Sequence, residues 1–247
     1  MTGRFLVTLI GGITGLALTQ IASAADLPRK APAYTPPPPV FSWTGFYIGG
    51  HAGYRWADAD VTFPSVQPGD DFFSQLNYKP SSFVGGLQAG YNYQFAPNWV
   101  VGVEGDWSWG NSSKTQQFDP VGLDQFVTVK AQWNASLRGR LGYALDRSLF
   151  YVTGGVAWMR VKVETVDFDD GVTDPNSSLT QSRTFTGWTV GGGYEYAFLT
   201  NWTARIEYFY ADYGNETFFQ GLNASTFFPA NVDLKTQTVR GALNYKF

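Results

Sequence analysis

The sequence contains no cysteine, one histidine and few charged residues. Without cysteine the chain cannot form disulfides, thiolate metal sites or a cysteine nucleophile. Charged residues make up 15% of the chain, below the ~25% of an average soluble domain. The formal net charge of −3 is weak, so the sequence gives no electrostatic basis for binding nucleic acid.

Long apolar runs are also missing, apart from one near the N-terminus. The run from Phe5 to Leu18 follows Arg4 and precedes Ala22-Ser23-Ala24, a small-residue cleavage pattern. We interpret residues 1–24 as a secretory signal peptide. A retained membrane anchor is the alternative, but the run is shorter than the ~20 residues that a spanning helix needs. Any later segment that crosses a membrane must therefore cross it as a β-strand.

Residues 25–42 are rich in proline. Prolines lack the N–H donor and favour an extended chain. We therefore predict a periplasmic linker here. The alternative is a contact with the cell wall or an envelope protein through Arg29 and Lys30.

The rest of the chain is rich in aromatic residues, which make up 17% of the sequence, and in glycine, with 28 residues. It contains eight segments in which apolar and polar residues alternate with a period of two, the pattern of a β-strand with two different faces. Most are at least as long as the ~9–11 residues that a tilted strand needs to cross a membrane. The segments are 43–56, 83–95, 99–109, 128–143, 149–163, 184–198, 202–212 and 234–247.

The connections between these segments alternate between short and long. Three are tight turns, at Ala96-Pro97-Asn98, Leu145 to Ser148, and Leu199 to Asn201. Short turns at one end and long loops at the other are typical of outer-membrane barrels. We therefore predict that residues 43–247 form an all-β, eight-stranded, antiparallel up-and-down transmembrane barrel, with short turns at one end and long loops at the other. The long connections are 57–82, 110–127, 164–183 and 213–233.

The alternation also assigns the two faces of the barrel wall. In the segment 202–212, Ile206 and Tyr208 alternate with Arg205 and Glu207. Every backbone group in hydrocarbon has to be paired, so the sheet must close, with the apolar face toward lipid and the charges inside. Buried charges persist when they are paired. We predict a ladder of ion pairs in the lumen, formed by Glu104, Asp106, Arg138, Arg140, Glu195, Arg205, Glu207, Arg240 and Lys246.

Aromatic residues stand at the strand ends, as expected for the belts at the two membrane interfaces. Trp99, Trp202 and Tyr143 lie near the short turns, and Trp107, Trp188 and Tyr210 are assigned to the opposite belt. The segment 149–163 departs from strict alternation. This predicts either a bulge near Met159 to Lys162 or a strand that extends past the membrane.

Six stretches together resemble a known family: WTGFYIGGHAGY, GVEGDW, ASLRGRLGYA, GGGYEY, ARIEYFYADYG and ALNYKF. They are similar to the small "porin family" surface antigens of Gram-negative outer membranes, which have an opacity-protein-like or OmpA-like barrel. The resemblance implies a location in the outer membrane, among its lipids and lipopolysaccharide, with short periplasmic turns and long extracellular loops. It also implies that Phe247 is the C-terminal signal read by the barrel-assembly machinery.

The resemblance leaves the activity open. Eight strands enclose an interior just wide enough for side chains to fill it. One interpretation is an envelope-structural protein that also lets small hydrophilic solutes diffuse through it. The alternative is an adhesion or partner-binding surface antigen with a closed, salt-bridge-filled lumen, and extracellular or cell-wall partners are compatible with either. Inward glycines such as Gly90 and Gly193 either leave free volume or make room for bulky neighbours.

An enzymatic role, such as lipid modification, is a remote alternative. His51 is expected to point into the lumen, where no base-orienting partner is readable from the sequence. The acidic segment Val166 to Asp174 lacks the ligand spacing of a calcium loop. We therefore predict no catalytic residue, metal site or cofactor.

Overall fold

The computed structural model describes residues 41–62, 75–118, 124–169, 172–173, 179–218 and 230–247. The predicted signal peptide and most of the predicted linker lie outside these residues. Within the described part of the chain, no helix is long and apolar enough to cross a membrane.

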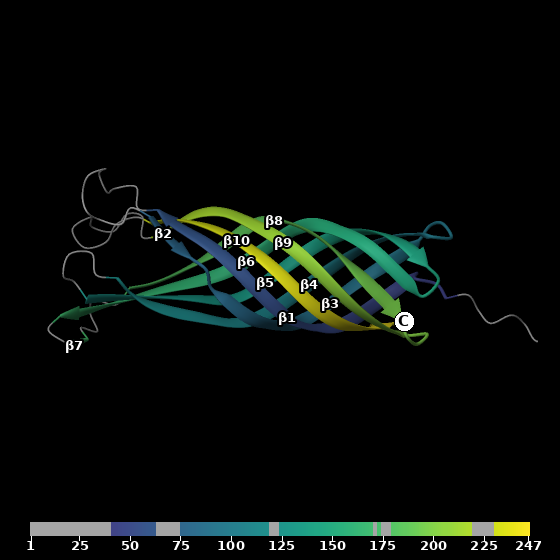
Figure 1. Ribbon diagram of the computed structural model, residues 1–247, viewed down its shortest axis with the longest axis horizontal. Helices are drawn as coiled ribbons and strands as arrows, with labels where there is room; N and C mark the ends of the chain where they lie inside the picture. Colours follow the sequence, from purple (N-terminus) through teal and green to yellow (C-terminus); the bar gives the residue numbers. More distant parts are fainter. Residues whose placement is uncertain (1–40, 63–74, 119–123, 170–171, 174–178, 219–229) are drawn as a thin grey trace, which may run out of the picture. The chain divides into compact units, whose positions relative to one another are not determined.

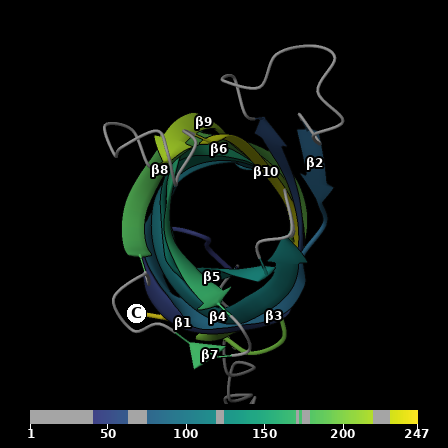
Figure 2. The same ribbon diagram turned by 90° about the vertical axis from the view of Figure 1, so that its left-hand side faces the viewer.

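The described strands form one antiparallel sheet that closes on itself (Figures 1 and 2), as predicted. Eight strands are long and two, β2 and β7, are short. Closure occurs where β1 pairs with β10, from Tyr47 opposite Lys246 to Thr62 opposite Asn231. The bounds are β1 Gly45–Thr62, β2 Gln75–Tyr78, β3 Ser81–Gln94, β4 Trp99–Phe118, β5 Asp124–Leu145, β6 Ser148–Asp169, β7 Val172–Thr173, β8 Leu179–Ala197, β9 Trp202–Phe218 and β10 Ala230–Lys246.

The three predicted tight turns are confirmed, and all lie at the same end of the barrel. The tightest joins β5 to β6 through Asp146 and Arg147 alone. Asp146 has a φ of 52°, a left-handed conformation that aspartate tolerates better than most residues. Asn98 closes the turn before β4, because its side-chain amide donates to the carbonyl of Ala144, at 2.8 Å.

At the opposite end the strands run further than predicted. The sequence predicts a loop over 110–127, but β4 continues to Phe118 and β5 starts at Asp124. These extensions carry polar residues such as Asn111, Ser112 and Ser113, so the alternation is lost while the backbone pairing continues. Side-chain periodicity therefore marks only the part of each strand that separates two different environments.

The predicted loop 57–82 also contains a strand, β2. It pairs with β1 in the same register as β3, with Tyr78 opposite Ala59 and Ser81 opposite Trp56. Pro80 interrupts this line because proline cannot donate to the ladder. Its carbonyl still accepts from the Ala57 N–H at 2.8 Å.

The predicted irregularity near Met159 is present, but on the neighbouring strand. In β5, Ala131 lies opposite Val161 and Trp133 opposite Arg160, so Gln132 is the extra residue of a bulge. Strand β6 itself pairs with β8 without a shift. The alternative expectation was a strand that extends past the membrane, and β6 continues beyond the predicted segment as far as Asp169.

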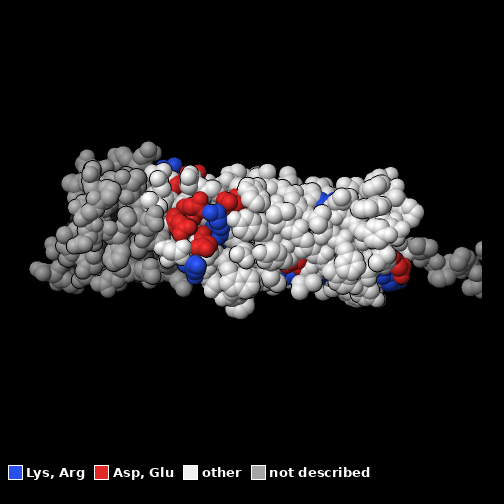
Figure 3. Space-filling model, turned by 45° about the horizontal axis from the view of Figure 1, so that its top comes forward, with Lys and Arg blue, Asp and Glu red and all other residues white. Residues whose placement is uncertain are grey.

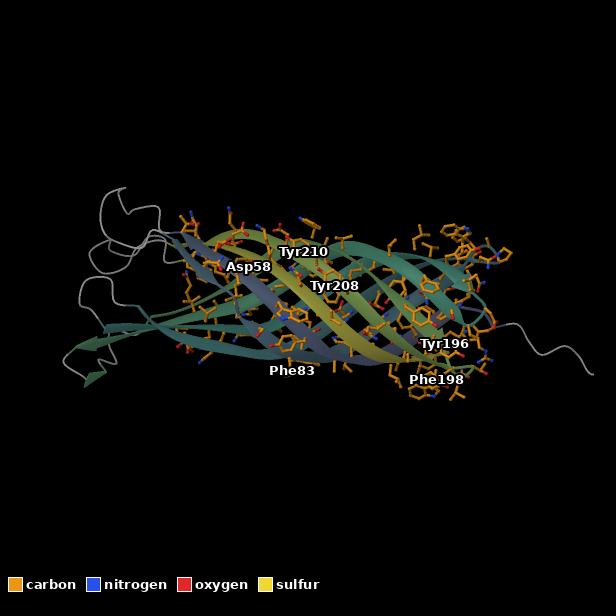
Figure 4. All side chains as sticks on the ribbon, viewed as in Figure 1. Asp58, Phe83, Tyr196, Phe198, Tyr208 and Tyr210 are labelled. Carbon is orange, nitrogen blue, oxygen red and sulfur yellow. The ribbon has the colours of Figure 1, made fainter. Side chains whose placement is uncertain are left out.

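The outer face carries a broad apolar band. Figure 4 shows Tyr196 and Phe198 outside the wall near the tight turns, and Phe83 and Tyr208 further along. Figure 3 shows a surface almost free of charge in this band, with charged side chains gathered beyond it toward the long connections and a smaller group at the opposite end. An exposed apolar surface this continuous requires an apolar surrounding, which is what a transmembrane barrel has.

The residues assigned to the aromatic belts lie on the outer face and pair across neighbouring strands. Trp99 packs edge-on against Tyr143, with ring centroids 5.4 Å apart, and Trp188 lies 5.5 Å from Tyr210. Trp202 contacts Tyr245 and Trp107 stacks on Trp133, at 5.3 Å and 4.5 Å.

The lumen is filled in three layers. At the end with the tight turns, Trp43 is 1% exposed and packs with Val100, Leu149 and Tyr151. Its indole N–H donates to the carbonyl of Asp146 at 3.1 Å. A charged layer follows in the middle. The third layer, toward the long connections, is an apolar cluster of Ala59, Ala157, Met159, Val161, Val163, Phe185, Ala211, Tyr213, Phe218 and Leu234.

Replacing Trp43 with alanine should lower the free energy of unfolding by about 3–5 kcal/mol, the usual cost of emptying a buried aromatic site. Trp99→Ala is the matched control, because Trp99 is 44% exposed on the outer face. Urea titration of the refolded protein measures both. Equal losses for the two variants would show that Trp43 does not close a packed layer.

Candidate functional site

The charged middle layer is set up by strand register. Inward positions on neighbouring strands place Glu104 opposite Arg138, Arg205 opposite Glu195, and Arg240 opposite Glu207. Residues directly opposite in an antiparallel pair have Cβ atoms about 4.5–5.5 Å apart. The alternation of each strand therefore brings opposite charges within reach before any long-range contact is considered.

The centre of the layer is a network of three arginines and three carboxylates. The Glu104 carboxylate accepts hydrogen bonds from both terminal nitrogens of Arg205, and its Oε1 also lies 2.7 Å from Nη2 of Arg138. This two-pronged geometry is the strongest form of arginine–carboxylate contact. Across the lumen Arg240 bridges the other two acids, with Nη1 2.8 Å from Asp106 Oδ1 and Nε bonded to Glu207.

A second pair extends the network toward the tight turns. Arg140 Nη2 lies 2.8 Å from Glu195 Oε2. The guanidinium of Arg140 also lies over the ring of Tyr151, 3.9 Å from its centroid. Glu195 accepts further hydrogen bonds from Thr203 Oγ1 at 2.5 Å and Asn244 Nδ2 at 3.0 Å. Four arginines thus face four carboxylates, all at least nine-tenths buried.

Two tyrosines connect the pairs into one network. The Tyr47 hydroxyl donates to Glu104 at 2.6 Å and accepts from Arg140 at 3.2 Å. The Tyr151 hydroxyl donates to Glu207 at 2.8 Å. The sequence interpretation missed these roles. The inward position of each tyrosine was readable, but the partner reached by its hydroxyl depends on side chains from strands far apart in the sequence.

Inward glycines make room for these rings. A Cβ on Gly90 would lie 2.4 Å from the hydroxyl of Tyr47, and one on Gly193 would lie 2.6 Å from that of Tyr151. Both distances are below any van der Waals contact. At these two positions a tyrosine from a neighbouring strand fills the space beside the glycine, so the glycine does not leave an open passage.

Lys246, which was predicted to join the ladder, lies apart from it. Its Nζ bonds to the carbonyl of Ser42 and lies 4.5 Å from the ring centroid of Phe41. Among the described residues it forms no ion pair. Position 246 is at the very end of β10, beyond the level of the carboxylates, which explains the difference.

His51 lies in the same layer, held on both ring nitrogens. Nδ1 is 2.9 Å from Gln88 Oε1 and Nε2 is 2.8 Å from Ser108 Oγ. Arg240 Nη1 lies 3.3 Å from Nε2. The ring is surrounded by other side chains in the lumen and is 6% exposed. These contacts make His51 part of the hydrogen-bonded network that fills the lumen.

A closed sheet of eight long strands, apolar outside and charged inside, with aromatic belts and tight turns at one end, is an outer-membrane β-barrel. Residues 17–247 match the family model described as "Outer membrane protein beta-barrel domain", and the chain belongs to this family. It is therefore a protein of the bacterial outer membrane.

Relatives of similar length support this assignment. The 31 kDa outer-membrane immunogenic protein of Brucella melitensis is 36% identical over 238 residues, 95% of this chain and 94% of that protein. The 25 kDa outer-membrane immunogenic protein of Brucella abortus is 33% identical, with 94% and 93% covered. The 22 kDa outer membrane protein of Rhizobium leguminosarum is 32% identical over 74% of this chain and 70% of its own. These names describe outer-membrane proteins, two of them immunogenic.

Removing one charge from the network should unfold the barrel more readily. Glu207→Gln leaves Arg240 without its carboxylate partner on β9, and breaking a buried pair costs about 3–5 kcal/mol. Urea titration of the refolded protein measures this loss in the free energy of unfolding.

Glu164→Gln is the matched control for this substitution. Glu164 lies on the β6 extension outside the membrane-spanning segment, 2.6 Å from both Lys130 and Lys162. Hydrogen bonds from these lysines lower its pKa to about 2, so it is charged at neutral pH, yet a surface pair contributes only about 0–1 kcal/mol. Similar losses for the two variants would contradict a stabilising network in the lumen.

Proposed function

We propose that the protein is a non-conducting structural and surface-displayed component of the outer membrane. In this proposal the barrel is an anchor, and the part that meets partners is carried by the long connections. The observation that supports it most directly is the packing of the lumen. Arg138 and Arg240 are each 1% exposed in the middle of the barrel.

A diffusion pore would need a continuous path for water through the barrel. Such a path would have to pass Trp43 at the end with the tight turns and then the charged layer. Trp43 is held by its hydrogen bond to the turn at Asp146, and the charged layer is held by hydrogen bonds between strands, such as Arg205 to Glu104. The filled lumen thus favours the surface-antigen interpretation over passive diffusion of solutes.

The strand extensions favour display at the surface. Beyond a shift in register after Trp109, strands β4 and β5 remain paired from Ser112 opposite Ala131 out to Phe118 opposite Gln125. A paired ribbon of this length extends the barrel wall beyond the apolar band. The immunogenic relatives agree with exposure of this kind, and extracellular partners that bind here belong to the proposal.

Lipid and assembly contacts complete the proposal. The apolar band and its belts would meet the outer-membrane lipids, including lipopolysaccharide. Phe247 is 68% exposed, and its backbone N–H donates to the carbonyl of Phe46 at 2.9 Å. The ring is thus available on the outside of the closing strand, which suits recognition by the barrel-assembly machinery.

The proposal assigns no catalytic role. Within the described residues, His51 is hydrogen-bonded to Gln88 and Ser108 inside the lumen, away from the lipid-facing surface where a lipid-modifying residue would act.

Planar-bilayer recording tests the closed lumen. The folded protein should produce no discrete current steps across a wide voltage range, because side chains occupy the path. Heat-modifiable migration on a gel establishes that the sample is folded, and an open porin added afterwards establishes that the bilayer can report a pore. Discrete steps that scale with salt concentration in the first phase would overturn the proposal.

A further inference from the structure

The apolar layer of the lumen contains a cavity of about 60 Å³. It lies toward the end with the long connections and is only partly enclosed. Its walls are almost wholly apolar, formed by residues such as Ala59, Met159, Val161, Phe185 and Leu234. Lumens of outer-membrane barrels are usually polar, so an apolar chamber needs its own explanation.

One buried cation lies at the edge of this cavity. Arg55 lines it and is 6% exposed. The four arginines of the charged layer each contact a carboxylate, but Arg55 forms no ion pair with any residue that the structure describes. Its Nη2 bonds to the side-chain oxygen of Asn134, a neutral partner.

The neighbours of Arg55 across the strands are also neutral. Thr238 lies opposite it on β10 and Ser82 on β3, and Ser82 also lines the cavity. A buried charge is costly unless an opposite charge and hydrogen bonds compensate it. The site thus offers a guanidinium and a hydroxyl beside an apolar wall, the usual composition of a small-molecule site with few polar groups that fix orientation.

We infer that this cavity binds a small amphipathic monocarboxylate. The carboxylate accepts hydrogen bonds from Arg55 and from the Ser82 hydroxyl, and the apolar tail lies against Met159 and Phe185. A water molecule takes up about 30 Å³ of liquid, so the cavity has the volume of about two water molecules. Because the cavity is open on one side, it receives the first carbons of the tail, and the rest of the tail extends through the opening. The inference goes beyond the proposed function and does not depend on it. The proposed function rests on the charged layer that fills the lumen, whereas the cavity lies on the other side of Arg55, toward the long connections.

Two simpler ligand classes are separated from this one by chemistry. An inorganic anion would use Arg55 but gain nothing from the apolar wall. A neutral apolar molecule would use the wall but gain nothing from Arg55. A carboxylate with a short tail uses both, so its affinity should exceed that of either class.

The test measures binding of hexanoate to the refolded full chain in phospholipid nanodiscs by calorimetry at neutral pH, with empty nanodiscs subtracted. Hexanamide keeps the tail and removes the charge, and acetate keeps the charge and removes the tail. Hexanoate should bind at least about tenfold more tightly than either, the scale of one charge-assisted hydrogen bond. Equal affinity for hexanoate and hexanamide, or no binding of hexanoate, would overturn the inference without any variant.

Arg55→Gln should weaken hexanoate binding by about tenfold or more and leave hexanamide unchanged. Arg160→Gln is the matched control, because Arg160 is exposed and bonds to Gln132 on the outer surface. If hexanoate binds to Arg55→Gln as it does to the parent chain, the role of Arg55 is refuted. Ala59→Leu, which narrows the apolar chamber and keeps Arg55, should weaken hexanoate and hexanamide alike, and unchanged binding there would refute the location.

Discussion

The structure depends on one constraint: inside hydrocarbon each backbone N–H and C=O has to find a partner within the sheet. Closure of β1 against β10 meets this constraint, since it removes both edges of the sheet. Closure also fixes where every side chain goes, because successive residues point to opposite faces. Half of them must tolerate lipid and the other half must fill a narrow cylinder. The composition follows, with exposed rings such as Trp99 outside and buried arginines such as Arg138 inside.

The charged layer is stable inside the barrel because four arginines face four carboxylates and because tyrosine hydroxyls donate hydrogen bonds to those carboxylates. A buried ion pair does not stabilise a protein simply by being present, since desolvation opposes it. Here Glu104 is shared by Arg138 and Arg205 and also accepts from Tyr47. The members of the layer therefore depend on one another, and removing one side chain breaks contacts to several strands at once. Arg55 differs from these arginines because it forms no ion pair with any residue that the structure describes.

Much of this arrangement could be predicted from the sequence, but not all of it. Alternation in 202–212 was enough to place Arg205 and Glu207 inside, and tight turns such as that at Asp146 were readable from their residue types. The strand extensions were missed because polar stretches such as Asn111 to Ser113 carry no two-sided pattern. The contacts across the lumen, such as Arg205 with Glu104 and Arg240 with Asp106, were not readable, because they depend on closure of the barrel, which joins β1 to a strand nearly two hundred positions later. The apolar layer escaped notice because Ala59 fell in a segment assigned to a loop.

The even number of full-length strands has a topological consequence. The chain enters and leaves the cylinder at the same rim, where Phe41 lies against Lys246, 4.5 Å from ring centroid to Nζ. Polypeptide joined ahead of Trp43 or behind Phe247 thus begins on the inner side of the membrane. A foreign epitope meant for the cell exterior must instead be spliced into one of the connections at the far rim. Circular permutation through the two neighbouring ends would need only a short bridge.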